Sequence, residues 1–199
     1  MATSTTQPTI QSTTQPTTQP THTRFLLLGN KSVGKTAYTR FFTKITEDKL
    51  ACPPDHFHPY RFDNDKYTLE FIEAVDTKTV VDVQFDCTIV FFSVTDLDSF
   101  DCAIKNITEL LTYQKPFILC GTHVDYKNRD VTQKHINKVL KEYHHTNGIS
   151  IKYTNISNLS GYQYYKPVLS LLSDLYITHT SNNYNFEPAT NNSNYLEFD

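Results

Sequence analysis

The sequence predicts an α/β fold in which a six-stranded, mostly parallel sheet carries helices on both faces. Short apolar runs such as CTIVFFSV and PFILCG are typical of buried strands. They alternate with longer segments in which apolar residues recur at three- and four-residue steps, as amphipathic helices require. Because strands that alternate with such helices form parallel sheets, we expect any ligand site at the carboxyl ends of the strands.

The elements are expected in alternating order along the chain. Strands are predicted at residues 24–28, 56–62, 66–74, 87–94, 116–121 and 149–154. Helices are predicted to start within GKTAYTRFF and to cover residues 99–114, 131–145 and 163–177. Asp63, Asn64 and Asp65 form a turn signature between the second and third strands.

With 199 residues, the chain is long enough for one domain with a sizeable core. Residues 1–23 are a Thr/Gln/Pro repeat that cannot bury enough apolar surface, so we expect them to be disordered. Residues 24–177 form the predicted domain. Residues 178–199 are an Asn-rich tail, which is either loose or docked on the domain through its aromatic residues.

Composition excludes several classes of function. The net charge of -3 and the pI near 6.2 argue against a binder of nucleic acid or of anionic membranes. The four cysteines include no Cys-x-x-Cys pair, so we expect buried thiols in a reducing compartment. No run is long enough to span a membrane, and neither a secretory signal nor a lipid-attachment motif is expected. The expected location is the cytoplasm, the nucleus or both.

The most specific motif is GNKSVGKT, at residues 29–36, between the first predicted strand and a helix. It matches the template G-x-x-x-x-G-K-[ST], in which glycines let backbone N–H groups turn toward phosphate oxygens at the positive end of a helix. Lys35 is expected to reach the β- and γ-phosphates, and the Thr36 hydroxyl to bind magnesium. A turn without a ligand is the alternative interpretation.

Two later motifs follow predicted strands. In LCGTHVD, Asp125 is placed to accept two hydrogen bonds from the amide and amine edge of guanine, which adenine could not supply. An acidic residue in an ordinary polar loop is the alternative. In ISNLSGY, a backbone N–H, that of Asn158, is expected to meet the guanine oxygen.

These three motifs, in this order, resemble those of the Ras-like small GTPases, and in detail those of the Ran branch. CTIVFFSVTD, FILCGTHVDYKNRDV and YTNISNLSGYQYYKPVLSLL carry the likeness, which extends over about residues 24–177. It implies a P-loop NTPase fold that binds GTP or GDP with Mg²⁺. The residues expected to bind the nucleotide are Gly29, Asn30, Lys31, Ser32, Val33, Gly34, Lys35, Thr36, Ala37, Thr122, His123, Asp125, Ser157, Asn158 and Leu159.

The two switch regions depart from the family pattern. Alignment places Cys52 where a threonine binds magnesium, although a shifted alignment would leave Thr46 in that role. A thiol is a poor ligand for Mg²⁺, so we expect a weakened metal site. In the second switch, Glu73, Asp76 and Thr77 replace the aspartate, the glycine and the water-orienting glutamine. We therefore assign no catalytic residue and expect a shortened second-switch helix.

The guanine motifs are only partly altered. Thr122 replaces the usual asparagine, His123 the lysine that covers the base, and Leu159 the lysine of the closing loop. An imidazole can still stack on a base, although it is ordinarily neutral near pH 7. We expect weakened affinity with guanine still the preferred base.

Three functions remain open. The first is a Ran-like guanine-nucleotide binder with weak or absent hydrolysis, and the second is a GTPase that depends on accessory proteins. The third is a pseudo-GTPase, a protein-interaction module that works independently of nucleotide. Partners implied by the resemblance are nuclear transport receptors and Ran regulators. The basic patch of the Ran branch is reduced here to Lys134, Lys138 and Lys141, and its acidic tail has no counterpart.

Overall fold

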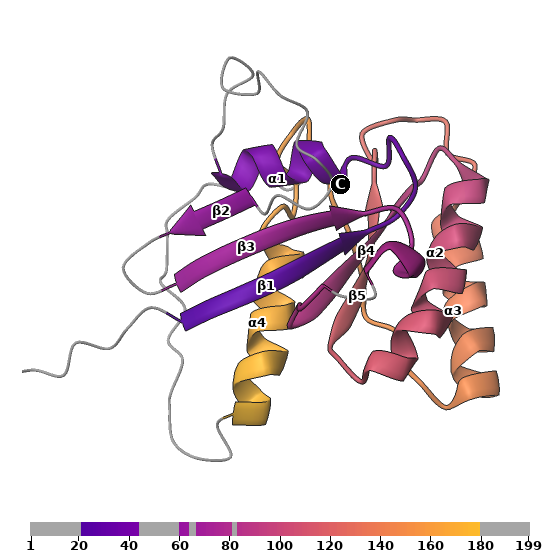
Figure 1. The fold of residues 1–199 in the computed structure, drawn as a ribbon. Coiled ribbons are helices and arrows are strands. Elements are labelled where there is room, and N and C mark those ends of the chain that lie inside the picture. Colours follow the sequence, from indigo (N-terminus) through magenta and orange to yellow (C-terminus); the bar gives the residue numbers. More distant parts are fainter. Residues whose placement is uncertain (1–20, 44–59, 64–66, 81–82, 180–199) are drawn as a thin grey trace, which may run out of the picture.

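The computed structural model describes residues 21–43, 60–63, 67–80 and 83–179. Its centre is a six-stranded sheet in the order β2-β3-β1-β4-β5-β6, with only β2 antiparallel to its neighbour (Figure 1). The strands are β1 (Thr21–Leu28), β2 (Tyr60–Asp63), β3 (Tyr67–Ala74), β4 (Cys87–Ser93), β5 (Phe117–Thr122) and β6 (Tyr153–Asn155). The predicted fold class is confirmed.

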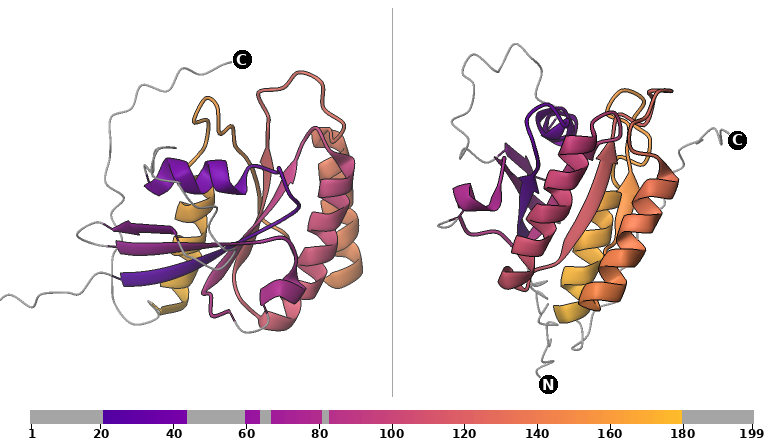
Figure 2. Two further views of the ribbon diagram at one scale, coloured as in Figure 1. Left: turned by 45° about the horizontal axis from the view of Figure 1, so that its top comes forward. Right: turned by 90° about the vertical axis from the view of Figure 1, so that its right-hand side faces the viewer.

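Helices cover both faces of the sheet (Figure 2). They are α1 (Lys35–Thr43), α2 (Leu97–Leu110), α3 (Gln133–Asn147) and α4 (Lys166–His179), with short 3₁₀ helices η2 (Thr77–Val80) and η3 (Leu111–Tyr113). Helices α1 and α4 pack on one face, and α2 and α3 on the other. Because β1, β4 and β5 run parallel, the loops that follow them emerge at one edge of the sheet.

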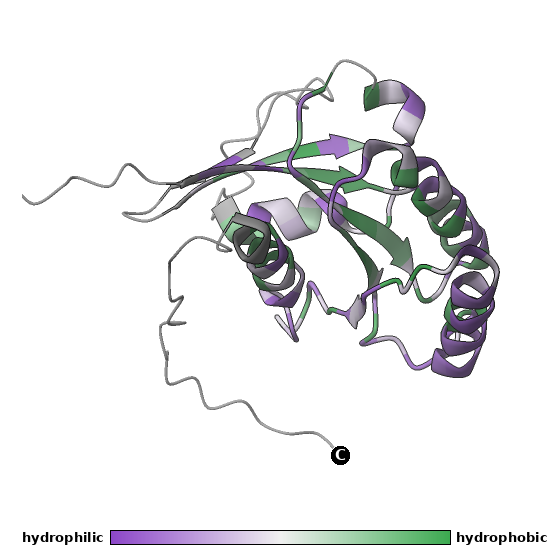
Figure 3. Cartoon of the chain, turned by 90° about the horizontal axis from the view of Figure 1, so that it is seen from below, coloured by the Kyte–Doolittle hydropathy of each residue, from purple (hydrophilic) through white to green (hydrophobic). Residues whose placement is uncertain are grey.

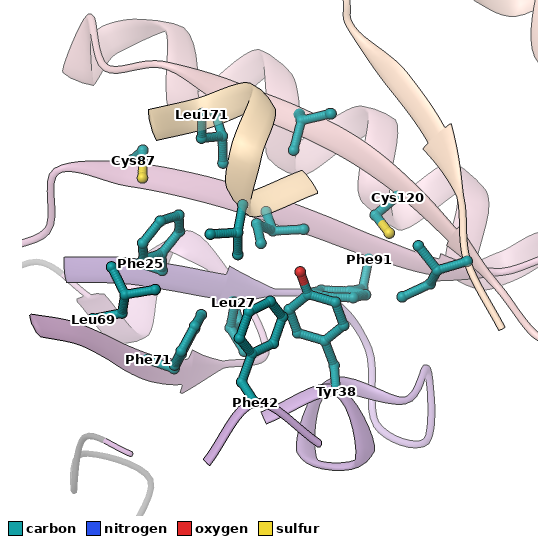
Figure 4. Close-up of a cluster of buried hydrophobic side chains, with 14 of the residues drawn as sticks. Phe25, Leu27, Tyr38, Phe42, Leu69, Phe71, Cys87, Phe91, Cys120 and Leu171 are labelled. Carbon is teal, nitrogen blue, oxygen red and sulfur yellow. The ribbon is translucent and has the colours of Figure 1, made fainter. Parts of the chain in front are cut away.

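The alternation of side chains along β1 builds two separate cores. Phe25 and Leu27 face α1 and α4, whereas Leu26 and Leu28 face α2 and α3, and all four are fully buried. Apolar residues therefore lie between the strands and both helical layers (Figure 3). On the α1 side the core contains several aromatic rings, and the Tyr38 ring packs against those of Phe42 and Phe91 (Figure 4). This packing holds α1, and with it the loop that precedes α1, against the sheet.

Local signals fix the ends of the two outer helices. The Asp96 carboxylate accepts a hydrogen bond from the Ser99 N–H at 3.1 Å and caps the start of α2. Thr132 caps α3 in the same way, and Gly148 ends that helix with φ of 70°, a conformation that glycine adopts without strain. The caps fix where α2 and α3 begin, and the loops before these helices follow directly from the ends of β4 and β5.

The structure corrects two predicted boundaries. Residues 21–23, assigned to the disordered segment 1–23, pair with residues 67–69 as the start of β1, because the long strand β3 offers them a partner. Helix α4 continues to His179, two residues into the predicted tail. The first switch, with Cys52 and Thr46, the turn residues Asn64 and Asp65, and tail residues 180–199 lie outside the described residues. Within the described ranges, no helix is long and apolar enough to cross a bilayer.

Candidate functional site

The GNKSVGKT segment forms a tight loop between β1 and α1, and two glycines make it possible. A Cβ on Gly29 would lie 2.4 Å from the Phe91 carbonyl oxygen, so no side chain fits where the loop crosses β4. Gly34 has φ of 90°, in the region that side-chain-bearing residues avoid. The two glycines are therefore required for the close turn that brings the loop to the start of α1.

Lys35 holds the loop in shape. Its ammonium donates to the carbonyl oxygens of Gly29 at 2.6 Å and of Asn30 at 2.8 Å. Burial lowers the pKa of this ammonium, and the charge of the nearby Glu73 carboxylate opposes that shift. An ammonium has three donors, so one remains for a phosphate oxygen at the positive end of α1.

Oxygen atoms suited to a hard cation lie beside Lys35. The Thr36 hydroxyl donates to Glu73 Oε2 at 2.8 Å, and the Thr39 hydroxyl lies 3.4 Å from Glu73 Oε1. Hydroxyl and carboxylate oxygens are ligands that Mg²⁺ prefers, so this pair fits a magnesium ion. Thr36 would hold Mg²⁺ directly and Glu73 would hold it directly or through water. Bound there, the ion would offset the negative charge of the phosphates.

The other predicted residues of the loop have unequal surroundings. Val33 is buried and anchors the loop in the core, and Ser32 has φ of 63°. Lys31 and Ala37 are exposed. The backbone of the loop carries the N–H groups that bind phosphate in such loops.

Two side chains from the loops after β5 and β6 form hydrogen bonds with consecutive carbonyl oxygens of the GNKSVGKT loop. The fully buried Thr122, at the end of β5, lies with Oγ1 2.9 Å from the Val33 oxygen and 3.0 Å from the Phe92 oxygen. Asn158, after β6, donates from Nδ2 to the Gly34 oxygen at 3.1 Å. The hydroxyl hydrogen of Thr122 is therefore committed to backbone oxygens, and Thr122 contributes support rather than a donor for the base.

The two guanine motifs meet at Asp125. Its Oδ1 accepts a hydrogen bond from the buried Ser157 hydroxyl at 2.6 Å, and the residue is otherwise exposed to solvent. A carboxylate has about four acceptor positions, so several remain for the guanine N–H groups. The His123 ring lies with Nδ1 2.8 Å from Ser93 Oγ. Leu159, by contrast, is 85% exposed.

The residues after Glu73 pack against α2, on the face of the sheet opposite α1. Asp76 Oδ1 accepts from the Thr79 N–H at 3.1 Å and so caps η2. Thr77 is buried and its hydroxyl donates to the Glu109 carboxylate on α2. Val80 is buried in the α2 core. Between β3 and β4 the described residues contain only this one short 3₁₀ helix.

Sequence reasoning missed three contributors to this site. Thr39 lies one helical turn after Thr36, and that spacing is a signal that places both hydroxyls on the same side of α1. Ser93 ends a buried strand, where ligand sites collect in such sheets. For the Asn158 side chain no sequence signal exists, because its partner Gly34 is 124 residues away.

The GNKSVGKT loop follows β1, and the loops that carry Asp125 and Ser157 follow β5 and β6 at the same edge of the parallel sheet. This arrangement defines a P-loop nucleotide-binding protein. Residues 66–176, more than half of the chain, match the model of the Ras family, and the chain belongs to that family. It is therefore a small GTP-binding protein. The phosphate loop precedes the matched range, so its assignment rests on the motif and its geometry. A comparison with individually curated proteins found no match.

Proposed function

We propose that this protein is a Ran-like small GTPase that binds guanine nucleotide but hydrolyses GTP weakly or not at all. The observation that carries the proposal is the placement of Thr77, which aligns with the glutamine that orients the attacking water. Thr77 is only 5% exposed and its hydroxyl is bound to Glu109. A side chain held in this way cannot position a water at the γ-phosphate.

Nucleotide retention is supported by the intact phosphate side of the site. Lys35, Thr36 and Glu73 form a connected set of charged and hydroxyl groups, and the two glycines give the loop its tight turn. We propose that the metal site is weakened, because Cys52 replaces a hard oxygen ligand in the alignment with the Ran pattern. A weakened metal site would leave nucleotide binding more dependent on Lys35.

The first test is the nucleotide content of the full chain purified in magnesium, with Lys35→Ala and Lys141→Ala as a matched pair. Lys141 is an exposed lysine on α3, outside the residues expected to bind the nucleotide, so its substitution should leave bound GDP or GTP unchanged. Lys35→Ala should lose the nucleotide, and circular dichroism would confirm that it remains folded. A wild-type protein that carries no nucleotide and binds none added would contradict the proposal.

The second test is single-turnover hydrolysis of bound GTP. We expect a rate no faster than that of GTP free in solution, because no described group replaces the missing glutamine. Addition of candidate activating proteins separates the proposal from a GTPase that depends on accessory proteins. A rate well above that in solution, alone or with an activator, would favour the enzyme.

The fastening of η2 also favours a second candidate, a protein-interaction module that does not respond to nucleotide. Thr77 and Val80 hold η2 against α2 through a hydrogen bond and burial. A surface held in this way would offer partners one conformation. Partners suggested by the resemblance are nuclear transport receptors and Ran regulators, which implies a location in the cytoplasm, the nucleus or both.

Hydrogen exchange distinguishes this candidate from a switch. If η2 is fixed, exchange in residues 76–80 should be the same with GDP and with a non-hydrolysable GTP analogue. Partner binding should likewise be equal for wild type and Lys35→Ala. Glu109→Ala serves as the positive control, because loss of its bond to Thr77 should raise exchange in η2. Nucleotide-dependent exchange in the wild-type protein would identify a working switch.

A further inference from the structure

We propose that Asn158 supplies the nucleotide site with the carboxamide that Thr122 lacks. The inference rests on guanine-nucleotide binding by this chain. In the Ran-like pattern an asparagine stands at position 122, and here a shorter side chain occupies it. The structure brings a carboxamide to the carbonyl next to the one that Thr122 reaches, from a different loop, the turn after β6.

The hydrogen bond of Asn158 joins two parts of the site that are remote in sequence. Its Nδ2 donates to the Gly34 oxygen at 3.1 Å, and the Tyr38 N–H donates to the same oxygen at 2.9 Å. A carbonyl oxygen has two lone pairs, so these two donors satisfy it. Asn158 thus ties the closing loop to the last peptide before α1.

The convergence of Thr122 and Asn158 on Gly34 supports an exchange of roles. A Cβ built on Gly34 would lie 2.6 Å from Asn158 Nδ2 and 3.8 Å from Thr122 Cγ2. The Thr122 hydroxyl reaches the Val33 oxygen, one peptide earlier in the loop. The hydroxyl of one loop and the amide of the other therefore support neighbouring carbonyls of the phosphate loop.

The other end of the amide is an unused acceptor. Asn158 Oδ1 is buried and has no hydrogen-bond partner among the described residues. A buried acceptor without a donor costs free energy, and a bound ligand or a water would supply that donor. The side chain keeps this position because its Nδ2 is bound to Gly34.

Asn158 is therefore a positioning residue, because it acts on the nucleotide through the phosphate loop. A nucleotide touches both loops, so a bond between them keeps the loops together and slows its release. One neutral hydrogen bond corresponds to a change of roughly three- to ten-fold in an equilibrium or release rate. The same bond should order the phosphate loop before any nucleotide binds.

The experiment measures release of fluorescent GDP from the full chain. Asn158→Ala should release it roughly three- to ten-fold faster than wild type. Asn158→Asp keeps the shape but turns the donor into an acceptor that faces the Gly34 oxygen, so it should release GDP at least as fast as Asn158→Ala. The double variant Thr122→Asn with Asn158→Ala should return release toward the wild-type rate, because the carboxamide is restored at its usual position. Unchanged release in the single variants, or no recovery in the double variant, would overturn the proposal.

A control variant and a measurement on nucleotide-free protein separate the role of Asn158 from general effects of substitution and from a failure to bind GDP. Asn155→Ala is the matched control, because its Nδ2 bonds to Gln133 on α3 rather than to the phosphate loop, and its release rate should match wild type. Hydrogen exchange in residues 29–37 of the nucleotide-free protein should be faster in Asn158→Ala than in wild type. This second measurement decides on Asn158 even if the chain binds no GDP, and equal exchange would contradict the proposed bond.

Discussion

Two buried threonines allow the same chemical change to be compared inside and outside the site. Thr122 is fully buried, and its hydroxyl lies 2.9 Å from the Val33 oxygen and 3.0 Å from the Phe92 oxygen. Thr88, on β4, is 1% exposed, and its hydroxyl has no hydrogen-bond partner within the described residues. Replacing either by valine exchanges a hydroxyl for a methyl group of similar size.

The two substitutions should have opposite effects on the free energy of unfolding. Thr122→Val removes a donor from buried carbonyls and should destabilise by about 1–2 kcal/mol. Thr88→Val removes a hydroxyl that is buried without a partner, so it should be neutral or stabilising by about 1 kcal/mol. The expected gap is about 2 kcal/mol, or roughly 30-fold in the unfolding equilibrium constant.

The assay is guanidinium unfolding followed by far-ultraviolet circular dichroism, since the chain contains no tryptophan. If the free energy of unfolding falls with the same slope against denaturant concentration in both variants, the difference between their midpoints reports the difference in stability. Thr122→Val should also speed the release of bound GDP, whereas Thr88→Val should not. The reasoning is refuted if Thr122→Val is as stable as Thr88→Val.

Two further predictions concern backbone geometry and pH. Gly29→Ala should abolish nucleotide binding, because its Cβ would meet a backbone oxygen at 2.4 Å, whereas Gly148→Ala, with open space and φ of 70°, should cost only about 1 kcal/mol in thermal unfolding. Partial burial raises the pKa of Glu70, but hydrogen bonds from His22 and Arg24 outweigh it and the pKa is lowered. The resulting stability is present above the unfolded-state pKa near 4.5 and is lost as the pH falls through the lower folded-state value. Glu70→Gln should therefore flatten the loss of stability below about pH 4.5, as measured by denaturant midpoints across pH.

The phosphate side of the site and the second-switch segment differ in what their side chains contact. Lys35 and the Thr36–Glu73 pair keep the groups that hold phosphate and a hard cation. Thr77, in contrast, is part of the packing against α2. Groups suited to phosphate and to a hard cation are thus present, while Thr77 is held in the packing between η2 and α2.

Most of the fold could be predicted because its signals are local. Apolar runs at β1, β4 and β5 and the helical spacing of α2 identify the elements, and their alternation implies a parallel sheet. The errors lie at ends, where long-range pairing decides: residues 21–23 become strand because β3 extends beside them. The position of the GNKSVGKT loop between β1 and α1 was equally predictable, because the motif has fixed residues at fixed spacing in one short segment; its role in phosphate binding stays a prediction.

By itself, the sequence determined where the GNKSVGKT loop and the two later motifs lie along the chain, because each is a short stretch of neighbouring residues. Only the tertiary structure decided which atoms those residues engage. Thr122 supports Val33, Asn158 reaches Gly34 and Thr77 binds Glu109, across 89, 124 and 32 residues of sequence respectively. Such contacts follow from how strands and helices pack, since a side chain's partner is set by distance in space and not by its place along the chain.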